Sequence, residues 1–163
     1  NNFTHFKLDT TYTVALADLT FNVNTGGQLA LDDLLNSEQS SITGPNKLSG
    51  FTSGSISGDE NWYFRGQLNK KHNLNDKLSV TPYVYGAAGV AYTLTPTSVE
   101  NRATAAKSIG LGLQVDSVDK YFFNKNVSAK LEYSKNWATG KLEDLSDVRL
   151  NKQHLGVNLA MTF

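Results

Sequence analysis

The chain has 163 residues, no cysteine and a formal net charge of zero, with 15 basic and 15 acidic residues. This length suits a single domain, and the lack of cysteine excludes disulfides, thiolate zinc sites and a cysteine nucleophile. The balanced charge gives no reason to expect nucleic acid as a partner. No run of about 18 apolar residues predicts a transmembrane helix.

Apolar residues alternate with polar or small residues along seven segments, which predicts β-strands with one apolar face. In chain order these segments are 3–16, 18–30, 61–70, 77–94, 105–116, 125–138 and a last one containing Leu155, Val157, Leu159, Met161 and Phe163. Most exceed the usual strand length of about 5–6 residues and reach the roughly 9–11 that a tilted transmembrane strand needs. The pattern therefore favours an all-β fold, an antiparallel transmembrane β-barrel, over a soluble sandwich.

The second face of these strands carries charge. Arg65, Gln67, Lys130 and Glu132 lie mid-strand on the polar face, and we expect them to face a wet barrel lumen, which tolerates charge that lipid does not. Aromatic residues near strand ends fit the girdles at membrane interfaces. These aromatic residues are Trp62, Phe64, Tyr92, Trp137 and Phe163.

The predicted connections alternate in length. Short connections at 17–18 and 71–76 alternate with longer ones at 32–60, 95–104 and 139–148, and the connection at 117–124 is intermediate. Outer-membrane barrels have short periplasmic turns and long external loops. This rule makes 32–60 an external loop and places Phe163 at the periplasmic end.

Seven strands do not close a bacterial barrel, because these barrels have an even number of strands and at least eight. An open sheet in lipid would leave unpaired backbone groups at its edges. We therefore expect residues 1–163 to be the C-terminal portion of a larger outer-membrane barrel, or to close with a partner. An eighth strand inside 32–60 is the alternative.

Three stretches resemble a known family. They are ITGPNKLSGFTSGSISGDENWYFRGQLN, then KLSVTPYVYGAAGVAY, and the alternating strand that ends at Phe163. They are similar to the C-terminal half of the two-partner-secretion outer-membrane transporters (TpsB, hemolysin-activator type), within the BamA-type superfamily. The resemblance implies that the long external loop folds back into the lumen.

The family's loop tip is a Val-Arg-Gly-Phe/Tyr tetrapeptide, and the matching positions are Leu48, Ser49, Gly50 and Phe51. A lumenal strand motif with Asp before Ala-Gly is matched by the stretch that holds Tyr83, Tyr85, Ala87 and Gly89. Ser49 thus replaces the arginine and Ala87 the aspartate of a pair thought to tie loop to wall. Losing both charges avoids the cost of leaving one unpaired.

The resemblance implies a pore that exports a partner polypeptide of the hemolysin or adhesin type across the bacterial outer membrane. The implied partners are outer-membrane lipid, the secreted polypeptide and the barrel-assembly machinery. That machinery would recognise Leu159, Met161 and Phe163 as a C-terminal assembly signal. No cofactor and no metal is expected.

Other functions stay open. A small structural or adhesive outer-membrane barrel is one alternative, and a soluble all-β binding domain is another. An enzyme is not expected, because no Gly-x-Ser-x-Gly motif occurs and His5, His72 and His154 are scattered along the chain.

Overall fold

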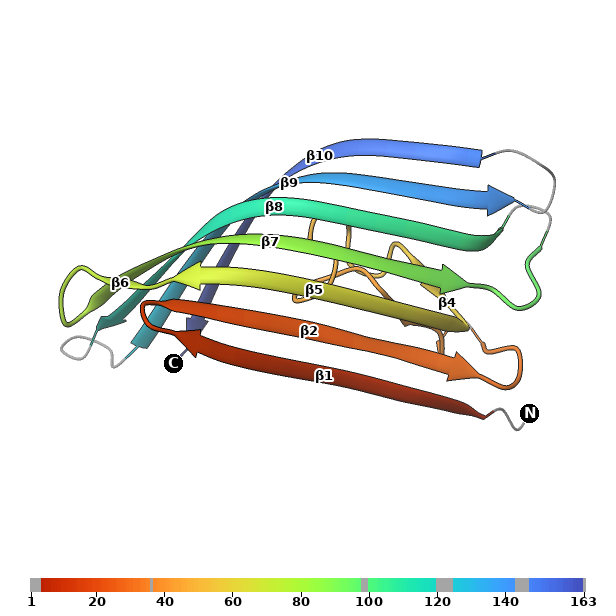
Figure 1. Cartoon of the computed structure of the whole chain (residues 1–163), viewed down its shortest axis with the longest axis horizontal. Coiled ribbons are helices and arrows are strands. Elements are labelled where there is room, and N and C mark those ends of the chain that lie inside the picture. The colour runs from red at the N-terminus through yellow and green to blue at the C-terminus, as the bar shows by residue number, and fades with distance from the viewer. Residues whose placement is uncertain (1–3, 36, 98–99, 120–124, 143–146, 163) are drawn as a thin grey trace.

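A computed structural model describes residues 4–35, 37–97, 100–119, 125–142 and 147–162, and in this part of the chain the fold is all-β (Figure 1). The long strands are β1 (His5–Leu16), β2 (Leu19–Ala30), β5 (Glu60–Lys70), β7 (Leu78–Tyr92), β8 (Asn101–Asp119), β9 (Lys125–Leu142) and β10 (Asp147–Thr162). Three two-residue strands complete the set: β3 (Ser40–Ser41), β4 (Ser57–Gly58) and β6 (His72–Asn73). The predicted all-β fold with seven long strands is confirmed.

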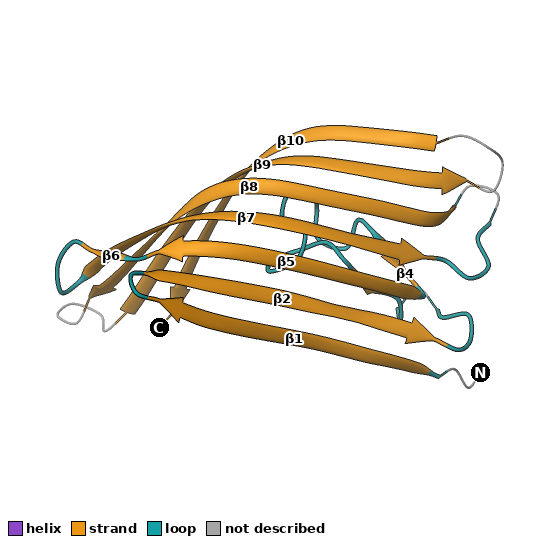
Figure 2. Ribbon diagram, viewed as in Figure 1, coloured by secondary structure: helices purple, strands orange, loops and turns teal. Residues whose placement is uncertain are grey.

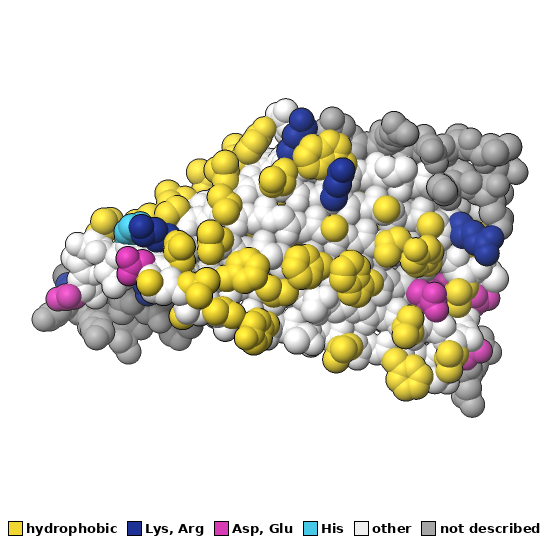
Figure 3. Space-filling model, viewed as in Figure 1, with side chains coloured by type: hydrophobic (Ala, Val, Ile, Leu, Met, Phe, Trp, Pro, Cys, Tyr) yellow, Lys and Arg dark blue, Asp and Glu magenta, His cyan; other side chains and the backbone are white. Residues whose placement is uncertain are grey.

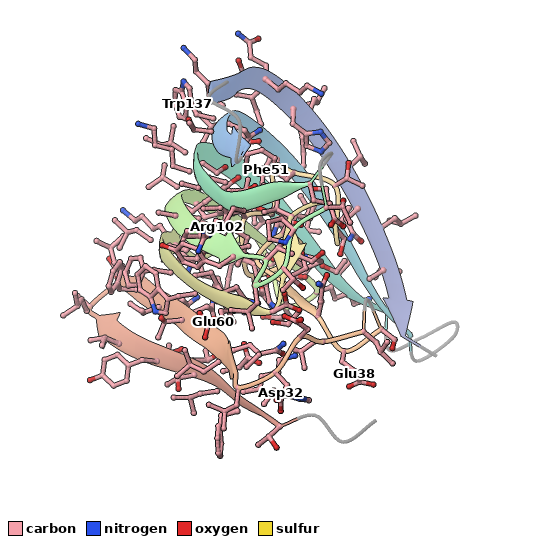
Figure 4. The ribbon with its side chains drawn as sticks, turned by 90° about the vertical axis from the view of Figure 1, so that its right-hand side faces the viewer. Asp32, Glu38, Phe51, Glu60, Arg102 and Trp137 are labelled. Carbon is pink, nitrogen blue, oxygen red and sulfur yellow. The ribbon has the colours of Figure 1, made fainter. Side chains whose placement is uncertain are left out.

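The seven long strands form one antiparallel meander in the order β1-β2-β5-β7-β8-β9-β10, with β6 added beside β7. The two-residue turn between β1 and β2 places Ala17 at a φ of 52°, as tight hairpins of this kind require. The sheet curves around an enclosed side (Figure 4). It does not close among the described residues, because the two edge strands each have a neighbour on one side only, which is β2 for β1 and β9 for β10. The architecture is therefore a partial barrel.

The predicted alternation places side chains on the expected faces. Along β5, β7 and β9 the buried residues alternate with exposed ones. The exposed side is apolar and includes Phe64, Val84, Ile109, Leu111, Leu131 and Val157. Figure 3 shows this outward face, with hydrophobic side chains spread over it. Trp62 and Phe64 lie on it with stacked rings 6.5 Å apart.

Several predicted strand ends were wrong. β8 begins at Asn101 and β9 extends to Leu142, so the connections predicted at 95–104 and 139–148 shorten to 93–100 and 143–146. Near these ends Thr104 pairs with Gly140 and Ala105 with Thr139. Backbone hydrogen bonds continue the ladder there although the side chains no longer alternate in hydropathy.

The described residues 32–35 and 37–59 contribute no further wall strand, which overturns the alternative of an eighth strand within 32–60. It contains β3 and β4, which pair only with each other as a separate two-stranded sheet. The turn predicted at 71–76 also differs from expectation, because its residues His72 and Asn73 form β6. Among the described residues no helix is long and apolar enough to cross a membrane.

Candidate functional site

The connection between β2 and β5, residues 31–59, lies against the enclosed face of the sheet and forms the core of the molecule. Figure 2 shows this loop in teal behind the strands. Its Ile42 and Leu48 are fully buried. They pack in a cluster with inward side chains of the wall, which are Tyr63, Tyr83, Tyr85, Ala87, Ala106 and Ala138.

Hydrogen bonds clamp the two ends of the loop beside β2 and β5. The buried carboxylate of Asp59 accepts hydrogen bonds from the backbone N–H groups of Leu34 at 3.1 Å and Leu94 at 2.9 Å. The Gln28 amide donates to the carbonyl oxygens of Glu38 and Asp59 at 3.1 and 3.2 Å. These bonds satisfy polar groups that burial would otherwise leave unpaired, so the loop has a fixed position at its base.

A tight turn brings the loop back on itself before its tip. Gly44 and Asn46 adopt positive φ values of 133° and 61°, and the backbone N–H of Leu48 donates to the Ile42 carbonyl at 3.2 Å. The Lys47 ammonium donates to the Ser41 carbonyl at 2.8 Å and lies 4.8 Å from the centre of the Tyr63 ring. Burial lowers the pKa of Lys47 below its ordinary value.

The tip of the loop, residues 48–51, contacts the wall through the Ser49 hydroxyl. The Arg65 guanidinium donates to the Ser49 hydroxyl oxygen at 2.6 Å, and that hydroxyl donates to the Glu132 carboxylate. Ser49 therefore bridges a cation on β5 and an anion on β9. One loop hydroxyl is held by two charged wall residues, and hydrogen bonds to charged groups are stronger than neutral ones.

Arg65 is fully buried, and its guanidinium has polar or aromatic partners on several sides. It donates to Gln67 Oε1 at 2.6 Å and to the Lys47 carbonyl at 3.1 Å, and it lies 3.6 Å from the centre of the Tyr85 ring. Its guanidinium is 3.5 Å from the Glu132 carboxylate. Carbonyl, ring and carboxylate together compensate the cost of burying the cation.

Glu132 joins three wall strands to the loop. Its carboxylate accepts a hydrogen bond from the Tyr83 hydroxyl at 2.7 Å and lies 3.5 Å from the Lys130 ammonium. With Arg65 and Ser49, this arrangement forms a network of β5, β7, β9 and the loop tip, here called the Arg65–Ser49–Glu132 network.

Gly50 brings the loop backbone close to the side chains of the wall. The Asn136 amide donates to the Gly50 carbonyl at 3.1 Å. A Cβ atom at position 50 would clash with the side chains of Asn136 and Ser134. Only glycine fits here without movement of the wall, since any other residue adds that atom.

The structure brings most of the predicted residues together. Leu48 and Gly50 are buried at the wall, Ser49 is partly buried there, and Phe51 packs partly buried against the same cluster. The four residues predicted on β7 are buried, and so are two of the four residues predicted to face the lumen. The buried residues are Tyr83, Tyr85, Ala87, Gly89, Arg65 and Glu132. Gln67 and Lys130 contact Arg65 and Glu132 respectively.

The predicted C-terminal signal lies elsewhere. Leu159 is on β10 and faces outward, 62% exposed. The backbone of Met161 pairs with Val127, and Phe163 lies outside the described residues. No contact joins this end to the docked loop tip within the part of the chain that the structure describes, and its role as a signal stays a prediction.

Two wall residues were missed by sequence reasoning, namely Asn136 and Ser134. Both are buried: Asn136 donates to the Gly50 carbonyl and to the Ser134 hydroxyl, and both side chains occupy the space that a Cβ atom at position 50 would need. Their places in an alternating strand indicated an inward face, but no local signal indicated contact with a loop more than 80 residues earlier. The docking is also unexpected in form, because Ser49 and Ala87 lack the charges of the implied pair and the loop is held by Arg65 and Glu132.

Comparison with known proteins gives one match. The family model described as haemolysin secretion/activation protein ShlB/FhaC/HecB matches residues 1–114, which is 114 of the 163 residues. The match includes the loop, its tip and strands β1 to β7. No curated protein sequence and no solved structure matches the chain.

Proposed function

Because the chain belongs to the haemolysin secretion/activation protein family ShlB/FhaC/HecB, we propose that it exports a partner polypeptide of the hemolysin or adhesin type. Members of this family are two-partner-secretion transporters of the bacterial outer membrane. They form a family of transporters rather than of enzymes. This location also fits the exposed apolar rows on the outward face, which a soluble domain would bury.

The sheet needs further strands to form a pore. The edges at β1 and β10 carry unpaired backbone groups, and each such group costs several kcal/mol in hydrocarbon. We therefore propose that residues 1–163 are the C-terminal portion of a larger barrel, whose other strands pair with these two edges. The outer-membrane lipid would surround the closed wall, and the barrel-assembly machinery would insert it using Leu159, Met161 and Phe163.

The inner wall suits the passage of an unfolded chain. Its polar residues offer hydrogen bonds to a backbone in transit without an apolar surface that would retain it. Some of these side chains remain partly exposed beside the docked loop, as Gln67 and Asn69 do on β5. The same strand presents the apolar side chains of Phe64 and Leu68 on its outward face.

The docked loop fills the space that a polypeptide would cross. Ile42, Leu48 and the Arg65–Ser49–Glu132 network fix it against the wall. Transport therefore requires the loop tip to leave the wall, and breaking this network is the step that opens the path. The docking geometry of residues 48–50 is the observation that carries the proposal.

A site-specific photo-crosslinker tests the path. Placed at Gln67, which faces inward, it should crosslink to the partner polypeptide during secretion. Placed at the neighbouring Leu68, which faces outward, it should not. Crosslinks at Leu68 but not at Gln67, or at neither position during active secretion, would contradict passage along this wall.

A further inference from the structure

Two lysines stand on the outward face of the wall, flanking a tryptophan. Lys107 on β8 is paired directly with Trp137 on β9, and Lys135 precedes Trp137 by two residues, so all three share one face. The ammonium groups lie 5.5 and 5.4 Å from the centre of the Trp137 ring. Figure 4 shows Trp137 on the outer side of the sheet, opposite the side that encloses Phe51.

On β8 and β9 the rows of large exposed apolar residues end near these cations, whereas on β5 and β7 they continue to Trp62 and Tyr92. On β8 the outward residues that follow are Ile109, Leu111 and Leu113, which are large and exposed. Lys107 precedes this row on β8 and lies toward the end of the sheet at which residues 31–59 connect β2 to β5. Long loops of such barrels are external, and tryptophan with snorkelling lysine marks the headgroup level of a membrane. The three residues thus lie at the outer-leaflet interface.

The two ammonium groups have no carboxylate partner among the residues that the structure describes. Both contact the Trp137 ring, which leaves their hydrogen-bond donors directed toward the surroundings. Figure 3 shows basic side chains in dark blue among hydrophobic ones on this face. An unpaired cation beside lipid attracts an anion.

Two shallow grooves meet at these residues. One, of about 390 Å³, runs between Trp62 and Trp137 over a floor that includes Ala88 and Ala105. The other, of about 580 Å³, runs between aromatic and aliphatic walls over a glycine floor, and its lining includes Phe21, Phe64, Gly66, Gly86 and Ile109. Lys107, Trp137 and Ala88 line both grooves.

We propose that this face is a binding site for a phosphorylated, multiply acylated lipid of the outer leaflet. Its acyl chains occupy the two apolar grooves on either side of the shared floor. Its phosphate oxygens accept hydrogen bonds from Lys107 and Lys135, and Trp137 lies between headgroup and chains. The charge of the lysine pair selects the phosphate, and the small residues of the floor make room for the chains. The site is on the opposite face from the docked loop and does not depend on export.

The test measures lipid retained by the protein purified from outer membranes in mild detergent, by native mass spectrometry with added lipid A. The Lys107→Gln/Lys135→Gln variant should bind about 30-fold more weakly, the factor expected for two lysines at about 1 kcal/mol each. Lys70→Gln/Lys71→Gln removes two charges at the opposite end of the sheet and should leave binding unchanged. Ala88→Leu fills the shared floor without changing charge and should also reduce binding.

Dephosphorylated lipid A and inorganic phosphate separate the possible sources of affinity. Weak retention of the dephosphorylated lipid, and no displacement of lipid A by inorganic phosphate, are the expected results. Equal retention of lipid A by the parent and Lys107→Gln/Lys135→Gln, or of lipid with and without phosphate, would overturn the proposal. Displacement by inorganic phosphate alone would show a simple anion site and would overturn the role of the grooves.

Discussion

Replacing Arg65 with glutamine should release the loop tip from the wall. The change removes the donor to Ser49 and leaves the buried Glu132 without its guanidinium neighbour at 3.5 Å. At that separation two unit charges attract by about 5 kcal/mol at an effective dielectric constant of 20. Lys130 lies equally near Glu132 and compensates part of this loss, so we expect a cost near the lower end for a broken buried pair, about 3 kcal/mol.

Cysteine labelling measures the release directly. The chain has no cysteine, so Leu48→Cys supplies a single thiol at a fully buried loop position. A maleimide should label it about 100-fold faster in the Arg65→Gln background, because about 1.4 kcal/mol corresponds to a factor of ten. Both proteins carry Leu48→Cys, so its own packing cost cancels to first order.

Lys71→Gln serves as the matched control, because Lys71 is an exposed cation in the turn beyond β5. It should leave the labelling rate unchanged. An equal rate in the Arg65→Gln protein and its parent would refute the reasoning, since the loop would then be held without the Arg65–Ser49–Glu132 network.

Three further changes test the docking geometry by the same labelling rate. Gly50→Ala should speed labelling, because the new methyl group meets the side chains of the wall. Gly66→Ala is the control and should not change the rate, because no atom lies nearer than 3.5 Å to its new Cβ. Equal effects of the two changes would contradict the close fit at Gly50. Ser49→Arg should also speed labelling, although the resemblance implies arginine there, because it places a second guanidinium beside Arg65; unchanged labelling would show room for both. Tyr83→Phe removes one hydrogen bond to a carboxylate, worth about 1.5 kcal/mol, and should raise the rate about tenfold; no rise would mean that this bond is dispensable.

The wall of the partial barrel was largely predictable from the sequence. Alternation of Phe64, Arg65 and their neighbours follows from the pleat, which sends successive side chains to opposite faces. It placed Arg65 and Glu132 on the enclosed face, where they are buried. The strand ends were less predictable, because Thr104 and Gly140 pair through backbone groups alone.

The docked loop could be predicted only in outline. The resemblance implied a loop folded into the lumen, but the expected arginine and aspartate are absent at Ser49 and Ala87. The contact between Ser49 and Glu132 joins residues 83 positions apart in the chain. No local sequence pattern predicts a contact over such a separation. The cation that holds the tip instead comes from Arg65, on the first wall strand after the loop.

The central claim is that the docked loop obstructs the path of the exported polypeptide. Single-channel conductance in a planar bilayer, measured together with secretion of the partner, tests it most directly when residues 44–58 are replaced by a short linker. We predict a larger conductance and altered secretion relative to the parent protein. Unchanged conductance together with unchanged secretion would contradict the claim, because the loop would then neither fill nor gate the pore.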